Sequence, residues 1–145
     1  MLFAGLDSLN GSELISPALQ SIHIAGFVFS IGTIALTDFS MLGLVLRGHS
    51  PSGIAKSLMP WTLVGFTLVL LSGGLLFMSD PDEYYLNRAF QVKMTFLLLA
   101  LIFHYTLHAR VARKDAPSVF ARLVALISLG LWVGVLAGGI FIGFA

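Results

Sequence analysis

Five ionisable side chains interrupt stretches of the chain that are otherwise apolar: His23, Asp38, Lys93, His104 and His108. An ionisable group is expensive to bury in an apolar environment, and within a membrane such residues usually serve ligand binding, ion passage or proton transfer. An imidazole nitrogen can bind haem iron or a metal ion, and an imidazole beside a carboxylate can pass a proton. These five residues are therefore the first candidates for a functional site.

One group of candidates surrounds His23. Lys93, Met78 and Met94 are expected at a similar height in the fold. His23 could therefore ligate a b-type haem, with a methionine such as Met78 as second ligand, or bind a metal ion. The structural alternative is that His23 forms a hydrogen bond across the helices while Lys93 extends toward the acidic loop at 80–83.

A second group consists of Asp38, His104 and His108. The two histidines are four residues apart, which places them on one face of a helix. They could bind haem or a metal ion there, or Asp38, the histidines and Lys93 could form a proton path. The structural alternative is an ion pair of Asp38, with Arg110 or with a protonated His108, that locks the helices together.

Height along the membrane separates the two groups. At about 1.5 Å per helical residue, His23 should lie roughly 8 Å, and His104 roughly 22 Å, from the same end of their helices. Two imidazoles that ligate one iron must lie at nearly the same height. We therefore expect two separate levels of polar side chains rather than one haem held between His23 and His104.

Four apolar stretches must position these side chains. They are predicted as helices at 17–46, 58–79, 88–109 and 123–144, since each holds the roughly 20 residues that a helix needs to cross a bilayer. The connections are short, so consecutive helices should be antiparallel neighbours. The prediction is an all-α, polytopic membrane protein: one four-helix bundle over residues 1–145.

Composition supports this class and excludes others. The chain is 57% hydrophobic and 10% charged, with a mean hydropathy of +0.95, unlike a soluble domain. It has no cysteine for a disulfide or an iron-sulfur cluster, and a net charge of +1 offers no nucleic-acid surface. Motifs of hydrolases, P-loops and dinucleotide-binding folds are absent from the sequence, so no self-contained enzyme is expected.

The distribution of charge predicts an orientation. Basic residues gather between the first and second stretches and between the third and fourth, whereas acidic residues gather at the opposite side. Basic loops are retained in the cytoplasm. We therefore expect a bacterial inner-membrane protein whose N- and C-termini and 80–83 loop are periplasmic. The basic residues are Arg47, Lys56, Arg110, Arg113, Lys114 and Arg122; the acidic ones are Asp7, Glu13, Asp80, Asp82 and Glu83.

Small residues predict which helix faces meet protein. Without a hydrophobic driving force between helices in lipid, close approach depends on small side chains. A stripe on the first helix and a glycine series on the last helix should therefore be packing faces. The stripe consists of His23, Gly26, Ser30, Thr33 and Thr37, and the glycines are Gly130, Gly134 and Gly138.

Two segments carry a family resemblance. One is HIAGFVFSIGTIALTDFSMLGLVLR, from His23, and the other is PWTLVGFTLVLLSGGLLFMSDPDEYYLNRAFQVKMTFLLLALIFH, from Pro60. They resemble a family of small uncharacterised four-helix bacterial inner-membrane proteins and, more loosely, CopD-type copper-resistance and cytochrome b561-like membrane proteins. The looser resemblances imply haem b, quinone-linked electron transfer or copper passage, with His23 as the best-matching position.

Three functions follow as hypotheses. The first is an inner-membrane subunit or electron-transfer module that binds one b-type haem, with membrane lipid and quinone as partners, in a homo-oligomer or larger complex. The second is a structural or assembly subunit without cofactor that packs through its glycine face onto a partner. The third is a CopD-like proton or metal-ion pathway.

Overall fold

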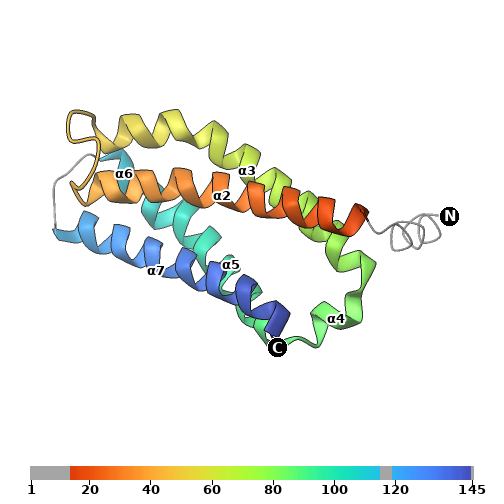
Figure 1. Cartoon of the computed structure of the whole chain (residues 1–145). Helices are drawn as coiled ribbons and strands as arrows, with labels where there is room; N and C mark the ends of the chain where they lie inside the picture. Colours follow the sequence, from red (N-terminus) through yellow and green to blue (C-terminus); the bar gives the residue numbers. More distant parts are fainter. Residues whose placement is uncertain (1–13, 115–118, 145) are drawn as a thin grey trace.

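The computed structural model, which describes residues 14–114 and 119–144, is built from helices (Figure 1). The described residues contain no strand, which confirms the predicted all-α fold. In chain order the elements are α2 (Ile15–Met41), α3 (Pro51–Ser79), α4 (Pro81–Tyr85), α5 (Arg88–Phe103), the π-helix η1 (His104–His108), α6 (Ala109–Arg113), α7 (Val119–Phe141) and the 3₁₀-helix η2 (Ile142–Phe144).

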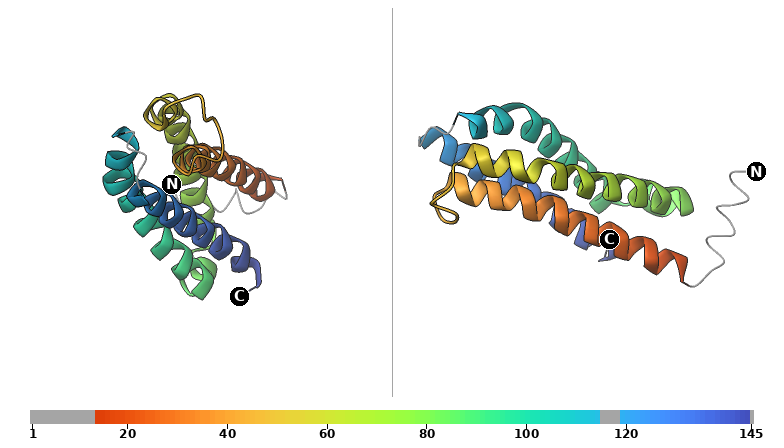
Figure 2. Two further views of the ribbon diagram at one scale, coloured as in Figure 1. Left: turned by 90° about the vertical axis from the view of Figure 1, so that its left-hand side faces the viewer. Right: turned by 90° about the horizontal axis from the view of Figure 1, so that it is seen from above.

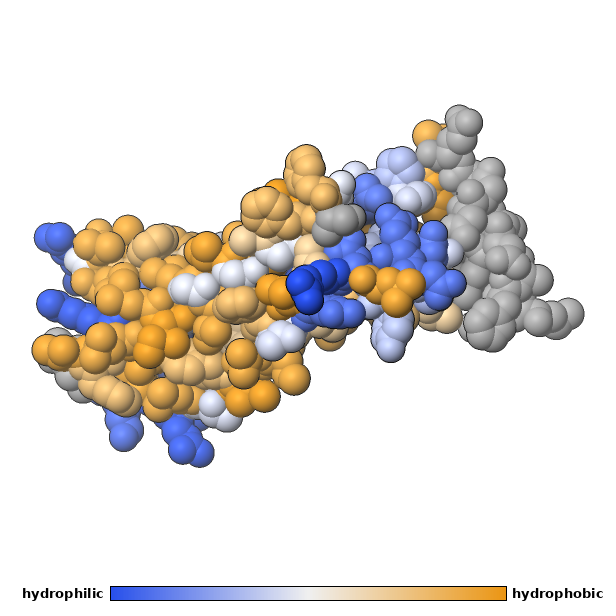
Figure 3. Space-filling view, turned by 90° about the horizontal axis from the view of Figure 1, so that it is seen from below, coloured by the Kyte–Doolittle hydropathy of each residue, from blue (hydrophilic) through white to orange (hydrophobic). Residues whose placement is uncertain are grey.

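Four segments are long and apolar enough to cross a membrane: Ile15–Met41, Pro51–Ser79, Arg88–Arg113 and Val119–Phe144. Their outward faces expose large apolar side chains; Leu71 and Ile140, for example, are each 64% exposed. Figure 3 shows hydrophobic side chains covering the middle of one face, with hydrophilic ones gathered toward both ends. So large an apolar surface needs a non-aqueous environment, as expected for membrane-spanning helices.

The two polar ends of the bundle differ in charge. The basic end holds Arg47 and Lys56 near the start of α3 and Arg110 and Arg113 on α6. The acidic end holds the 80–83 segment at α4. The termini themselves and the acidic residues Asp7 and Glu13 lie outside the described residues, so the predicted orientation in the membrane stays a prediction.

The four spans pack as two pairs. α2 lies against α3, and α5 lies against α7, while a contact between α2 and α7 joins the pairs (Figure 2). The backbone of α3 approaches the third span at α6, at the basic end, and at the acidic end the Phe77 ring of α3 stacks on Phe90 of α5, with centroids 5.7 Å apart. The expectation that every helix packs along the next one in sequence is therefore wrong for α3 and α5.

Two predicted helix boundaries near the basic end need correction. α2 ends at Met41 and not at residue 46, because Gly43 adopts φ +74°, the left-handed conformation that terminates helices. α3 begins at Pro51 and not at residue 58, because Ser50 caps its first turn by accepting from the Gly53 amide at 3.2 Å. Hydropathy located both spans but not these local stop and start signals.

The other two spans also differ from their predicted limits. The third span runs past residue 109 to Arg113, and its backbone changes to a π-helix at His104–His108. The fourth is already helical at Val119, its first described residue, rather than at residue 123. Short π-helical segments are rare and often occur at functional sites. η1 is therefore a candidate part of a functional site.

An apolar layer fills the centre of the bundle. Within it Phe66 stacks on Trp132, with ring centroids 5.5 Å apart. The backbones of α2 and α3 approach closely where Gly26 faces Gly65: a Cβ on Gly26 would lie 3.0 Å from the Gly65 carbonyl oxygen. The layer consists of Phe27, Ile34, Phe66, Val69, Leu97, Ala100, Trp132 and Val135.

Both predicted packing faces point into the protein. Gly26, Ser30 and Thr37 of the α2 stripe are buried, and Thr33 hydrogen-bonds Thr62 of α3 at 2.6 Å. On α7, Gly134 packs against the Phe96 ring and Gly138 against Lys93 of α5, whereas Gly130 has open space around its Cβ position. The glycine series thus serves mainly the α5–α7 contact within the chain.

Candidate functional site

At the acidic end, the His23 ring is fixed by α3. Its Nδ1 lies 3.1 Å from the Val69 carbonyl oxygen and 3.0 Å from Ser72 Oγ. The Ser72 hydroxyl donates its own proton to the Leu68 carbonyl at 2.5 Å. Both neighbours of Nδ1 therefore act as acceptors, so Nδ1 must carry the hydrogen and Nε2 the lone pair. The predicted hydrogen bond of His23 across the helices is present.

The surroundings of the ring explain its place. Gly73 lies directly against it, and a Cβ at this position would come within 2.8 Å of His23 Cε1. Phe27 meets the ring edge to face, with centroids 5.0 Å apart. The sequence Ser72-Gly73 thus supplies both an acceptor and the room that the imidazole needs. A small-residue run facing a histidine was the sequence signal for this contact.

Lys93 of α5 points inward. Its Nζ lies 3.4 Å from His23 Nε2, to which it can donate, and 4.7 Å from the centroid of the Phe27 ring. The ammonium also lies beside Gly139. The expectation that Lys93 extends to the acidic loop is wrong, because within the described residues it forms no ion pair with Asp82 or Glu83 and instead contacts His23.

A cavity of about 760 Å³ opens beside this pair, between α2, α3, α5 and α7. Its wall is largely apolar, with His23 and Lys93 as its inner polar groups and Glu83 and Tyr84 at the α4 segment. Met94 lines the cavity, but the predicted ligand Met78 does not and is 41% exposed.

Tyr84, where the α4 segment lines the cavity, keeps its phenolic proton. Burial, together with the carboxylates of Glu83 and Asp80, raises the pKa of Tyr84. The phenol is therefore an uncharged hydrogen-bonding group at physiological pH.

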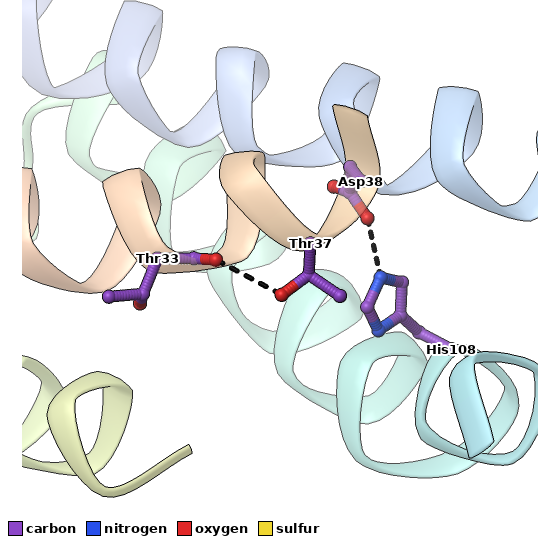
Figure 4. A network of polar contacts seen from close by, with 4 residues as sticks. All are labelled: Thr33, Thr37, Asp38 and His108. Atoms are coloured by element: carbon purple, nitrogen blue, oxygen red, sulfur yellow. Dashed lines mark hydrogen bonds and ion pairs between the residues drawn. The ribbon is translucent and has the colours of Figure 1, made fainter. Parts of the chain in front are cut away.

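At the basic end, Asp38 and His108 meet inside the bundle. His108 Nε2 donates to Asp38 Oδ1 at 2.5 Å, and both side chains are buried (Figure 4). Neighbouring Thr37 does not extend the contact, because its hydroxyl donates back to the Thr33 carbonyl at 3.2 Å. Of the two predicted partners for Asp38, the structure selects His108; Arg110 forms no ion pair in the described part of the chain.

His104 lies beside this pair. Its ring stacks on that of His108, with centroids 4.9 Å apart and planes inclined by 29°, and it meets Trp132 edge on. Its Nδ1 is buried without a hydrogen bond. No group of three histidine or carboxylate side chains among the described residues is arranged to hold a metal ion. The suggested His104–His108 metal site therefore lacks a supporting ligand set.

The structure places the candidates on two levels. His23 and Lys93 form one, and Asp38, His104 and His108 form the other. Between them lies the apolar layer, represented by Ile34 on α2 and by Leu97 and Ala100 on α5. No single haem or metal could use histidines from both levels.

Three elements of these sites were not foreseen from the sequence: Ser72, Ser128 and the π-helix. Ser128 of α7 is buried, and its hydroxyl lies beside the Asp38 carboxylate, close enough to interact with it. Serine within an apolar helix was the available signal, but it does not say which helix the hydroxyl faces.

Comparison with known proteins adds a family but no activity. No curated protein and no solved structure matches this chain, and no similarity to CopD-type or cytochrome b561-like proteins emerges. Residues 10–145 match DUF6644, a family of unknown function.

Proposed function

This chain belongs to the DUF6644 family of unknown function, and we propose that it is a membrane electron-transfer protein that holds one b-type haem in the acidic-end cavity through His23. The observation that carries the proposal is the state of the His23 ring. Its Nδ1–H donates to the Val69 carbonyl, which leaves the Nε2 lone pair on the side of Lys93. Histidines that ligate metals are nearly always held in this way.

The cavity fits such a group in four respects. Its volume of about 760 Å³ is within the range of cofactor sites, roughly 300–1,000 Å³. Its apolar wall keeps water from the bound group, and Lys93 can pair with a carboxylate of it. Met94 lines the cavity and is the candidate for a second ligand. When bound, a b-type haem supplies reversible one-electron transfer.

The residues around the cavity have distinct roles in this proposal. His23 binds the iron, while Val69 and Ser72 hold the ring in one orientation and tautomer. Lys93 must leave Nε2 for the iron to bind, and its flexible stem allows this movement. The cavity lies among membrane-spanning helices, so we expect the electron partner to be a quinone dissolved in the bilayer.

The other two hypotheses have less support. A structural subunit would need a free glycine face, but Gly134 and Gly138 are occupied by α5. A proton or metal-ion pathway would need groups that pass the proton or ion along the bundle. Between His23 and Asp38 the polar side chains of α2 are hydroxyls that bond to carbonyls of their own helix or to Thr62, among apolar side chains. The homo-oligomer or larger complex stays a proposal, as nothing in a single chain bears on it.

The first experiment is an absorption spectrum of the detergent-purified protein, oxidised and dithionite-reduced, with a pyridine haemochrome assay. We expect about one haem per chain and a reduced α-band. The His23→Ala variant should lose both. The matched control is His49→Ala, since His49 is an exposed histidine on the loop at the basic end. A colourless wild-type protein, or haem retained in His23→Ala, would overturn the proposal.

A further inference from the structure

The cluster at the basic end contains polar atoms that the structure leaves unsatisfied. His104 Nδ1 is buried without a hydrogen-bond partner, and Asp38 Oδ2 and Ser128 Oγ are buried beside one another without full hydrogen-bond geometry. Buried polar atoms are nearly always paired, because an unpaired one loses its hydration without compensation. A contact that only locked the helices would not need an unpaired imidazole nitrogen of His104 beside the Asp38–His108 pair.

The side chains of the cluster can together bind a variable number of protons. Two imidazoles lie in stacking contact, but a single carboxylate, Asp38, is available to balance them. Two adjacent imidazolium ions repel one another, whereas one imidazolium beside a carboxylate is stabilised. The π-helical backbone of η1 carries both rings: His104 at its first residue and His108 at its last.

The position of the cluster determines with which end of the bundle it can exchange protons. Asp38 is in the last turn of α2, which ends at Met41 at the basic end. On the other side lies the apolar layer, and the α2 hydroxyls beside it bond to carbonyls of their own helix. The surrounding elements carry Lys56 on α3, Arg110 and Arg113 on α6 and Arg122 on α7, none of which forms an ion pair within the described residues. Among the described residues, the ion-pair partner of Asp38 is therefore His108, on which the His104 ring stacks.

We propose that Asp38, His104 and His108 form a proton-binding site that takes a proton from water at the basic end and returns it to the same side. The arriving proton is held on the imidazole nitrogens and the Asp38 carboxylate, and the unpaired Nδ1 of His104 is where water or the proton is received. No electron is needed for this step. The site is independent of the haem proposal, since it shares no residue with the acidic-end cavity.

Nuclear magnetic resonance of protein labelled with ¹⁵N-histidine in detergent tests this site directly. The chain has only four histidines, and His→Gln variants assign their ring nitrogens. As the pH is lowered from neutral to mildly acidic values, below the range of an exposed histidine, we expect the signals of His104 and His108 to change together in one step. The Asp38→Asn variant should shift that step by about one pH unit or more, a tenfold change in proton affinity. His49 is the internal control.

Two outcomes would overturn the proposal. One is that the ring nitrogens of His104 and His108 keep the same state throughout this range. The other is that the step is identical in Asp38→Asn and in wild type. His104→Gln, which leaves Asp38 and His108 in place, gives a second test. The pH-dependent change of the His108 signal should differ from that in wild type, and an unchanged His108 response would also reject a shared site. Haem content does not enter this measurement.

Discussion

At the scale of residues, the Asp38–His108 pair shows how a membrane bundle accommodates charge. A buried carboxylate without a partner is strongly unfavourable, whereas a paired one is tolerated. Asp38 is fully buried, and His108 Nε2 contacts one of its two oxygens. The pair should therefore contribute little compared with two apolar residues, yet the removal of either partner should be damaging.

This expectation can be measured as a double-mutant cycle. Asp38→Leu and His108→Leu should each lower the free energy of unfolding by about 3–5 kcal/mol, because each leaves a buried polar group unpaired. The double variant should be clearly more stable than the sum of the single effects predicts. Denaturant unfolding in mixed micelles gives the values. Additive effects of the two substitutions would show that the contact is not formed in the membrane protein.

At the scale of elements, the contact between α5 and α7 depends on glycine. A Cβ on Gly138 would lie 2.9 Å from Lys93 Cβ and 3.0 Å from its backbone Cα, whereas Gly130 has nothing within 4 Å. The neighbour of Gly138 is backbone and cannot simply rotate away. The two helices must therefore separate if the side chain at position 138 becomes larger.

Alanine substitution tests this contact with a matched control. Gly138→Ala should destabilise the protein by about 1–3 kcal/mol, as overpacking does in close-packed interiors. Gly130→Ala should be neutral or stabilising by up to about 1 kcal/mol, since alanine favours helix and the site is open. Unfolding of both variants in the same micelles decides the matter. Equal effects at the two glycines would contradict the packing described.

At the scale of the whole molecule, the bundle has an apolar middle and a separate polar site toward each end. The apolar layer joins the helices in the middle, and polar groups lie on either side of it: a cavity with His23 and Lys93 toward the acidic end and the Asp38 cluster toward the basic end. The orientation of the bundle determines from which side of the membrane the proposed site takes its proton and on which side the proposed haem cavity lies.

Orientation can be tested cleanly, because the chain has no native cysteine. Asp82→Cys places one reporter at the acidic end, and Gly48→Cys places one in the exposed loop at the basic end. Since basic loops stay in the cytoplasm, a membrane-impermeant thiol reagent should label Asp82→Cys in intact cells. It should label Gly48→Cys only after the membrane is opened. The reverse pattern would invert the predicted topology.

The sequence alone determined the features that depend on local properties. The absence of charge over about 20 residues located four spans, and the rise of a helix placed the candidate residues on two levels. The small-residue stripe on α2 and the shared helix face of His104 and His108 followed from helical periodicity. Each of these inferences uses only residues that are close together in the chain.

The tertiary structure alone decided which groups meet. It brought Lys93 to His23 rather than to the acidic loop, and it paired Asp38 with His108 rather than with Arg110. These contacts join residues 70 positions apart. They depend on how far each helix is rotated, on the change of backbone in η1 and on the α2–α7 contact. Such quantities are set by the packing of all four helices together, so hydropathy and spacing within one helix could not predict them.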